Sequence, residues 1–178
     1  MGDSLSAAYR LPIEQGWVTL LEQNLQKDNP NITIINASIS GETTQGGRSR
    51  LPKLLQQNTP DIVILELGGN DALRGYPLAK TKENLAFMIE NAQQYTTDIL
   101  LLGTRIPPNY GRRYSEAFLN LYQELTIQYK INHVPFMLEN VALDKSLMFN
   151  DGIHPNAQGQ IKVLGNIMPE VLSILDSK

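Results

Sequence analysis

Three side chains near the two ends of the sequence could together perform nucleophilic catalysis. Ser4 supplies a hydroxyl in the opening stretch Gly2-Asp3-Ser4-Leu5-Ser6. Asp151 and His154 supply a carboxylate and an imidazole in Asp151-Gly152-Ile153-His154-Pro155. An imidazole, whose ordinary pKa is about 6.5, can accept a hydroxyl proton near neutral pH. A carboxylate three residues away is close enough to orient the ring, so these residue types predict a serine nucleophile site.

Each of these residues also has an ordinary structural interpretation. Ser4 or Asp3 could cap a short helical turn over residues 5–10. The loop that holds Asp151 and His154 could be a turn closed by an Asx hydrogen bond. The second histidine, His133, stands at the start of a short apolar stretch, and we interpret it as structural.

Two loops between these ends could hold the oxyanion that develops during acyl transfer. Gly41 follows a β-branched run, and Asn70 lies in Gly68-Gly69-Asn70-Asp71 directly after another apolar run. The backbone N–H groups of Ser4 and Gly41 and the side-chain amide of Asn70 are suitable donors. The alternatives are a simple turn glycine at position 41 and a left-handed turn residue at position 70.

The elements that must position these residues alternate between strands and helices. We expect strands over residues 32–37, 61–67, 99–103 and 134–137, and helices over 13–25, 50–58, 80–95, 114–129 and 157–175. This order implies an α/β fold with a parallel sheet covered on both faces. The loops over 38–47, 68–71 and 105–113 each follow a strand, so they fall on the carboxyl edge, where such sheets bind ligands.

Composition bounds the function further. A chain of 178 residues with 42% hydrophobic residues predicts one domain spanning residues 1–178. The net charge of -3 gives no electrostatic reason to expect nucleic acid as a partner. No apolar run is long enough to cross a bilayer, so we expect no membrane insertion. The absence of cysteine excludes a thiol nucleophile and thiolate metal sites.

Taken together, the Gly2–Ser6 stretch, the Gly41 loop, the Gly68–Asp71 stretch and the Asp151–Pro155 stretch resemble the four sequence blocks of the SGNH (GDSL) hydrolases, in the family's order. Asn36–Gly41, Glu66–Gly75 and Asn109–Tyr114 are similar to the bacterial thioesterase/protease/lysophospholipase and arylesterase members. The resemblance implies a three-layer α/β/α, flavodoxin-like fold. It also implies an esterase or thioesterase acting on aryl esters, lysophospholipids and acyl thioesters.

The resemblance assigns a role to each block. Ser4 would be the nucleophile that carries the acyl group, His154 the base and Asp151 its orienting partner. Ser4, Gly41 and Asn70 would form the oxyanion hole. Seven residues in two loops would border the acyl chain: Leu73, Tyr76, Pro77, Leu78, Ile106, Pro107 and Tyr110. Packing of these loops onto the core is the alternative for each.

The same resemblance implies a small-molecule acyl ester or thioester as the substrate, with no cofactor and no metal, and we expect a monomer. Close relatives are exported, so by analogy we expect a periplasmic or secreted protein; the absence of a signal peptide from this sequence leaves a cytoplasmic location open. In the family an apolar strand runs into the first block. Only Met1 stands there, and we therefore expect the first strand to be truncated before Gly2.

Other classes of protein compete with the enzyme interpretation. Asp3, Asn70, Asp71, Asp151 and His154 could form a two-metal phosphoesterase site, but two histidines are few for one. The glycine-rich loop 41–47 could bind phosphate, yet it lacks the Gly-Lys-Ser/Thr ending of a P-loop. A non-catalytic SGNH-fold binding protein and a carbohydrate acetylesterase are the remaining alternatives.

Overall fold

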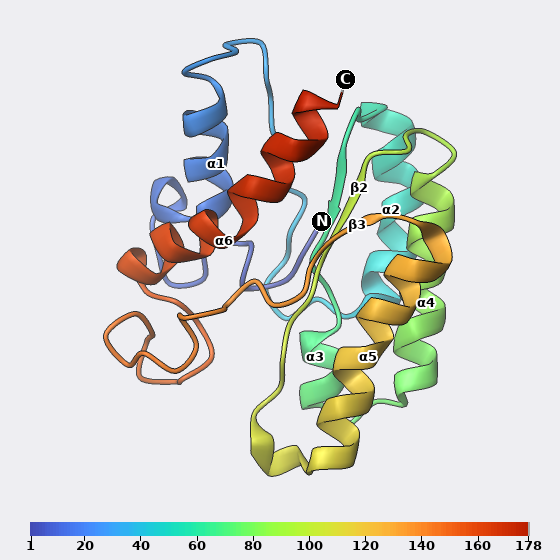
Figure 1. Cartoon of the computed structure of the whole chain (residues 1–178), viewed down its shortest axis with the longest axis vertical. Coiled ribbons are helices and arrows are strands. Elements are labelled where there is room, and N and C mark those ends of the chain that lie inside the picture. Colours follow the sequence, from blue (N-terminus) through green and yellow to red (C-terminus); the bar gives the residue numbers. More distant parts are fainter. Residues whose placement is uncertain (178) are drawn as a thin grey trace. The chain divides into compact units, whose positions relative to one another are not determined.

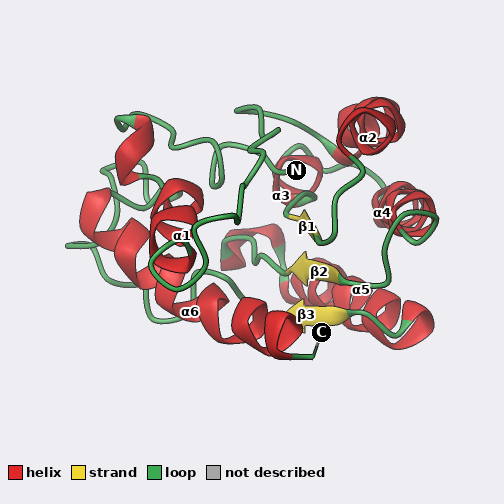
Figure 2. Cartoon of the chain, turned by 90° about the horizontal axis from the view of Figure 1, so that it is seen from above, coloured by secondary structure: helices red, strands yellow, loops and turns green. Residues whose placement is uncertain are grey.

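Three short runs of aliphatic residues form a parallel sheet. The computed structural model describes residues 1–177 and, except at position 108, their side chains. The strands are β1 (Val63–Leu65), β2 (Ile99–Leu102) and β3 (Asn132–Val134), and they are hydrogen-bonded in that order. The register places Leu101 of β2 opposite Leu65 on one side and His133 on the other. Figure 2 shows the three strands side by side, and they confirm the predicted α/β class with a parallel sheet.

The contacts between residues divide the chain into two compact units. The sheet unit holds Met1 and Gly41–Phe136, and the terminal unit holds Gly2–Ser40 and the chain from Met137 onward. Figure 1 labels the elements of both units. The prediction of one domain over residues 1–178 stays a prediction, and each unit is described by itself below.

Helices of the sheet unit cover one face of the sheet. They are α2 (Thr44–Asn58), α3 (Gly69–Leu73), α4 (Leu78–Ala92) and α5 (Arg112–Tyr129), with the 3-10 turn η2 (Pro108–Tyr110) before α5. Figure 2 shows α2, α4 and α5 on the same side of the strands, and α4 packs against both of the others. Every residue of β2 is buried, together with Leu85, Phe118 and Tyr122 from the helices, so the core lies between this helical layer and the sheet.

Local signals explain where these elements begin and end. Helix α2 begins at Thr44, inside the predicted loop, because the Thr43 hydroxyl accepts a hydrogen bond from the Gly46 N–H at 3.3 Å. Strand β3 ends at Val134, three residues before the predicted end at 137, because Pro135 has no N–H to continue the ladder.

Met1 lies beside the free edge of β1. Its nitrogen donates to the Ile64 carbonyl at 3.1 Å, and the Glu66 N–H donates to the Met1 carbonyl at 2.9 Å. A strand residue next to a parallel neighbour makes this pair of bonds. The geometry agrees with the expectation that a strand leads into Gly2, and the truncation itself stays a prediction.

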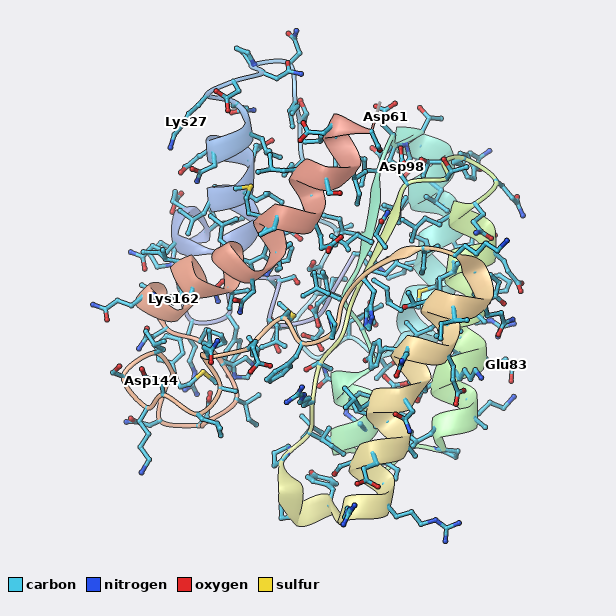
Figure 3. All side chains as sticks on the ribbon, viewed as in Figure 1. Lys27, Asp61, Glu83, Asp98, Asp144 and Lys162 are labelled. Atoms are coloured by element: carbon cyan, nitrogen blue, oxygen red, sulfur yellow. The ribbon has the colours of Figure 1, made fainter. Side chains whose placement is uncertain are left out.

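The amino end of the sheet carries acidic residues. Asp61 and Asp98, which Figure 3 labels, lie near each other ahead of β1 and β2. The Val63 N–H donates to the Asp98 carbonyl at 2.9 Å, and the Thr96 hydroxyl donates to the Asp61 carbonyl at 2.6 Å. These bonds close the amino end of the sheet with backbone and hydroxyl groups. The candidate site residues of this unit follow the strands and therefore lie at the carboxyl end.

In the terminal unit, two helices from opposite ends of the sequence pack together. They are α1 (Trp17–Leu25), preceded by η1 (Ile13–Gln15), and α6 (Ala157–Asp176). The Trp17 N–H, which starts α1, donates to the buried Gln160 side chain at 2.9 Å. The Asn156 side chain caps α6 by accepting from the Gln158 and Gly159 N–H groups. This packing joins the segment that contains Ser4 to the segment that contains His154.

The predicted strand over residues 32–37 does not form. The structure shows irregular backbone there, and the side chains of one α1 residue and of the residue that ends α1 bond to its backbone. The Ile34 N–H donates to Glu22 at 2.7 Å, and the Gln26 amide donates to the Ile32 carbonyl at 2.7 Å. The β-branched composition of this stretch therefore led to a wrong prediction of a strand.

Candidate active site

Ser4 lies in a tight series of turns at the start of the terminal unit. The Asp3 side chain accepts from the Leu5 N–H at 2.9 Å, and the Asp3 carbonyl accepts from the Ala7 N–H at 3.0 Å. Asp3 is buried and its side chain closes this turn, so of the two predicted capping residues Asp3 takes that role and Ser4 does not. The Ser4 hydroxyl points elsewhere, to a residue 150 positions further along the chain.

The three residues predicted for nucleophilic catalysis meet in the terminal unit. Ser4 Oγ lies 2.8 Å from His154 Nε2, and His154 Nδ1 lies 2.9 Å from Asp151 Oδ2. An ionised carboxylate only accepts hydrogen bonds, so Nδ1 carries the ring proton and Nε2 is free to accept from the hydroxyl. The arrangement can therefore move the Ser4 proton to the imidazole.

Asp151 uses its two oxygens for different purposes. Oδ1 accepts from the N–H groups of Ile153 at 2.9 Å and His154 at 3.0 Å, which closes the turn, while Oδ2 faces the His154 ring. The Asx-turn interpretation and the catalytic interpretation are thus both satisfied by one carboxylate. Burial alone would raise the pKa of Asp151, but the His154 and Ile153 N–H groups and the His154 ring outweigh it and lower the pKa to about 2. The carboxylate is therefore charged throughout the neutral range.

The loop around His154 is fixed by its own backbone. The Phe149 N–H donates to the His154 carbonyl at 2.8 Å, and Met148 and Pro155 form an antiparallel bridge. Gly152 turns the chain with a φ of +66°, a conformation that side chains rarely adopt. Helix α6 begins directly afterwards, so a rigid element holds the imidazole in place.

Two residues that sequence reasoning missed contact the candidate triad. The Tyr9 ring lies 4.3 Å from the His154 ring, centroid to centroid, at an angle of 37°. Arg10 Nη1 lies 3.8 Å from Asp151 Oδ2, and the Arg10 guanidinium stands 5.1 Å from the centre of the Tyr9 ring. The sequence offered one signal, an aromatic residue and a cation five and six positions after Ser4. That spacing did not predict the contacts with His154 and Asp151, because the backbone from Ser4 to Arg10 has no regular period.

That irregular backbone places Tyr9 between two left-handed residues. Ala8 has a φ of 52° and Arg10 a φ of 60°, and neither is a glycine. Such conformations cost free energy and persist only where surrounding contacts enforce them. Here they turn the Tyr9 ring against the imidazole.

Gly41 and Asn70 belong to the sheet unit, and their local geometry is distinctive. Gly41 has a φ of +79°, so the turn-glycine interpretation is correct and compatible with an exposed amide. Asn70 lies in the first turn of α3, and the left-handed residue there is Gly68, with a φ of +120°. The interpretation of Asn70 as a left-handed turn residue is therefore wrong. Its side chain starts from a helix end whose backbone dipole favours negative charge.

The two predicted acyl-chain loops lie against each other in the sheet unit. The Tyr110 hydroxyl donates to the Leu73 carbonyl at 2.9 Å, and the Tyr114 hydroxyl donates to the Tyr76 carbonyl at 3.1 Å. Of the seven candidates, Ile106 is buried in the core, and Leu73 and Leu78 pack against the core; the exposed ones are Tyr76, Pro77, Pro107 and Tyr110. The core-packing alternative thus describes Ile106, Leu73 and Leu78, and the exposed residues are the ones available to a ligand.

The structure offers little to the other classes of site. Within residues 1–177 no three His, Cys, Asp or Glu side chains are grouped closely enough to ligate a metal ion. Asp71, one of the candidate metal ligands, is engaged with Thr44 instead. The same described residues contain no helix that is both long and apolar enough to cross a membrane.

Ser4, His154 and Asp151 are therefore in continuous contact, and comparison with known proteins gives the family. Residues 1–161 match the model of the GDSL-like lipase/acylhydrolase family, and the chain belongs to that family. It is therefore an enzyme of the SGNH hydrolase class, as the four sequence blocks predicted.

Three curated relatives cover most of the chain. It is 45% identical to Esterase TesA of Pseudomonas aeruginosa, over 98% of this chain and 87% of that protein. It is 44% identical to an arylesterase of Vibrio mimicus, over 90% of this chain and 80% of that protein. It is 42% identical to thioesterase 1/protease 1/lysophospholipase L1 of Escherichia coli, over 90% of this chain and 76% of that protein.

Solved structures agree with the family. A crystal structure of TesA, 45% identical, superposes with a TM-score of 0.94 over 97% of this chain and 96% of that one. The psychrotrophic esterase EstA of Pseudoalteromonas, inhibited by monoethylphosphonate, is 37% identical and superposes with a TM-score of 0.91 over 99% of this chain and 96% of that one. The predicted fold class is confirmed over nearly the whole chain.

Proposed function

We propose that this enzyme hydrolyses acyl esters and thioesters in two steps through an acyl-Ser4 intermediate. The observation that carries the proposal is the continuous contact from Ser4 Oγ to His154 and from His154 to Asp151, at 2.8 Å and 2.9 Å. In the first step His154 Nε2 takes the Ser4 proton while Oγ bonds to the acyl carbon. His154 then returns that proton to the departing alcohol or thiol.

The second step releases the acyl group. A water molecule gives a proton to His154 Nε2 as its oxygen bonds to the acyl carbon, and the proton passes to Ser4 Oγ as the acid leaves. Asp151 stays ionised throughout and stabilises the imidazolium, which its pKa of about 2 supports. No cofactor or metal enters the cycle.

The oxyanion of each tetrahedral intermediate needs donors, and we assign the Ser4 and Gly41 N–H groups and the Asn70 side chain. Support comes from the family's sequence blocks and from local geometry: a left-handed glycine at 41 and a helix first turn at 70. Removing one such donor typically lowers turnover about 100- to 1000-fold.

The substrate we propose is a small molecule with a flexible apolar acyl chain, such as an aryl ester, a lysophospholipid or an acyl thioester. The names of the relatives, an esterase, an arylesterase and a thioesterase/lysophospholipase, support this class. The exposed side chains of Tyr76, Pro77, Pro107 and Tyr110 would border the acyl chain. A monomer that is exported to the periplasm or secreted fits the resemblance to exported family members.

Covalent labelling tests the nucleophile. A p-nitrophenyl alkylphosphonate should add one alkylphosphonyl group per chain with release of p-nitrophenol, measured by intact mass. Ser4→Ala should abolish the adduct, and the control Ser6→Ala, which removes the nearest other hydroxyl in the same turn, should keep it. An adduct that survives in Ser4→Ala would refute the assignment.

A chain-length series tests the substrate class. Hydrolysis of p-nitrophenyl esters from acetyl to palmitoyl, beside an acyl-CoA, should occur with wild type and fall to near background with His154→Ala. Activity on acetyl esters and acetylated sugars alone would favour the carbohydrate acetylesterase. No hydrolysis of any ester by wild type would favour a non-catalytic binding protein.

A further inference from the structure

The two sheet-unit segments assigned to the oxyanion are joined to each other by a buried ion-dipole link. The Asp71 carboxylate accepts from the Thr44 N–H at 2.9 Å and from the Thr44 hydroxyl at 2.5 Å. Both residues are almost inaccessible, with 2% of Asp71 and none of Thr44 exposed. Asp71 directly follows Asn70, and Thr44 comes three residues after Gly41. The link therefore connects the segments that hold these two donors.

The Thr44 hydroxyl also accepts a hydrogen bond, in addition to the one it donates to Asp71. The Asn84 side-chain amide in α4 donates to the Thr44 hydroxyl at 3.1 Å, and Arg48 donates to Oδ1 of the same side chain at 3.2 Å. A hydroxyl that donates to a carboxylate and accepts from an amide has one preferred orientation. The pair is thus fixed in direction as well as in distance.

A second bond ties the same two segments from the other end of α3. Arg74 Nη2 donates to the Gly41 carbonyl at 3.1 Å. The Gly41 peptide, whose φ of +79° no ordinary side chain would favour, is thereby held from its carbonyl side. Asp71 and Arg74 lie about one helical turn apart, so α3 and its C-cap residue bond to the Gly41–Thr44 segment at two points.

Capping of α2 accounts for only one of the two bonds to Asp71, because the Thr44 N–H is a first-turn donor of that helix, whereas the Thr44 hydroxyl is not. The Thr43 hydroxyl already caps that helix by accepting from the Gly46 N–H. A buried carboxylate costs free energy unless its hydrogen bonds compensate, and here both compensating bonds come from one residue in a distant segment. The bonds serve to hold two loops at a fixed separation.

We propose that Asp71 and Thr44, assisted by Arg74, are positioning residues that set the separation between the Gly41 N–H and the Asn70 side chain. The inference rests on the proposed function, which assigns those two donors to the oxyanion. Donors stabilise the transition state only when they are held near 3 Å from the developing charge. Loosening the link should therefore lower kcat and leave KM nearly unchanged.

Thr44 offers a matched pair of variants. Thr44→Val removes the hydroxyl with little change of shape, and Thr44→Ser keeps it. With a p-nitrophenyl ester we expect Thr44→Val to lower kcat about 10- to 100-fold, since a displacement of about 1 Å costs up to 100-fold. KM should stay within about threefold. Thr44→Ser should restore most of kcat. Thr96→Val, which removes a hydroxyl at the opposite edge of the sheet, should behave as wild type.

A double-mutant cycle separates positioning from simple stability. In an Asn70→Ala background, Thr44→Val should cost less than about threefold in kcat, because the donor it positions is already gone. Asp71→Asn, tested in the same cycle, provides a second variant if Thr44→Val folds poorly. Thermal unfolding of each variant, followed by assay well below its Tm, shows whether kcat per folded molecule has changed.

The outcomes distinguish the two proposals. If Asn70→Ala keeps wild-type kcat, the oxyanion assignment fails, and the positioning role fails with it. If Asn70→Ala loses about 100-fold or more but Thr44→Val and Asp71→Asn only lower Tm, the assignment survives and the positioning role is overturned. Full additivity of the two losses would overturn it as well.

Discussion

Replacing Asp151 by asparagine should disable the candidate triad by reversing the histidine tautomer. Asp151 Oδ1 faces two backbone donors, the N–H groups of Ile153 and His154, while Oδ2 faces His154 Nδ1. Asparagine has only one acceptor oxygen, and we expect the Ile153 and His154 N–H groups to bond to it. Its NH2 group must then point at Nδ1 and donate to it. The ring proton moves to Nε2, where it faces Ser4 Oγ, and the imidazole can no longer accept the serine proton.

The expected loss in kcat follows from the loss of the correct His154 tautomer. A triad in which asparagine imposes the wrong tautomer loses about 10⁴-fold in kcat in a serine protease with the same roles. We expect a loss of that order here, equivalent to about 5 kcal/mol of transition-state stabilisation. KM should change little, because Asp151 does not belong to the proposed acyl-chain loops.

The assay is turnover of a p-nitrophenyl ester, supported by the rate of phosphonate labelling at Ser4. Both should fall in parallel, because both need the serine proton to be removed. Asp144→Asn is the matched control: Asp144 also closes a turn in the terminal unit, by accepting from the Ser146 N–H and hydroxyl, and it does not contact the triad. A folded Asp151→Asn variant within tenfold of wild-type kcat would refute the tautomer argument.

Three further predictions concern stability and the surroundings of the triad. The pKa of Asp151 is about 2 in the fold and near 3.9 in the unfolded chain, so the ionised carboxylate stabilises the fold above pH 3.9. This stabilisation should disappear as the pH falls toward 2. The free energies of unfolding of wild type and Asp151→Asn, measured in urea, should therefore converge there. Tyr9→Ala should lower kcat about 3- to 10-fold through loss of the ring contact, whereas Tyr9→Phe should not; equal losses would indicate a role for the hydroxyl. Tyr110→Phe removes the bond to the Leu73 carbonyl, so the preference for long over short acyl esters should weaken, and an unchanged chain-length profile would exclude these loops from the acyl site.

Much of the fold and the candidate triad could be predicted because their signals are local. The aliphatic run at β1 lies between Pro60 and Gly68 and the run at β2 ends at Gly103, so both strands were located, although β1 is shorter than the predicted range 61–67. Asp151 and His154 lie three residues apart, and a loop of that length can bring a carboxylate to a ring nitrogen without help from the rest of the fold. That Ser4 reaches His154 depended on four sequence blocks considered together, since nothing in either stretch specifies a partner 150 residues away.

The parts of the structure that could not be predicted depend on contacts between polar side chains whose positions follow no periodic pattern in the sequence. The stretch over residues 32–37 has strand-like composition, but its backbone bonds to the side chains of Glu22 in α1 and Gln26 just after it. The Thr44–Asp71 link is similarly hidden, because neither residue belongs to an apolar pattern and 27 positions separate them. Pairs of polar residues are recognised only after the fold has brought them together.

The left-handed residues beside the nucleophile show how strain can indicate function. A sequence suggests positive φ through Gly or Asn, but this chain places Ala8 and Arg10 there. Each such residue costs about 1–3 kcal/mol, which a relaxed turn with glycine would avoid. The distortion positions Tyr9 against His154 and Arg10 beside Asp151. Because Arg10 is largely exposed and its ion pair is long, that pair contributes little stability, and the ring contact is the stronger reason for the distortion. The strained turn is therefore best explained as part of the apparatus that holds the imidazole in line with Ser4.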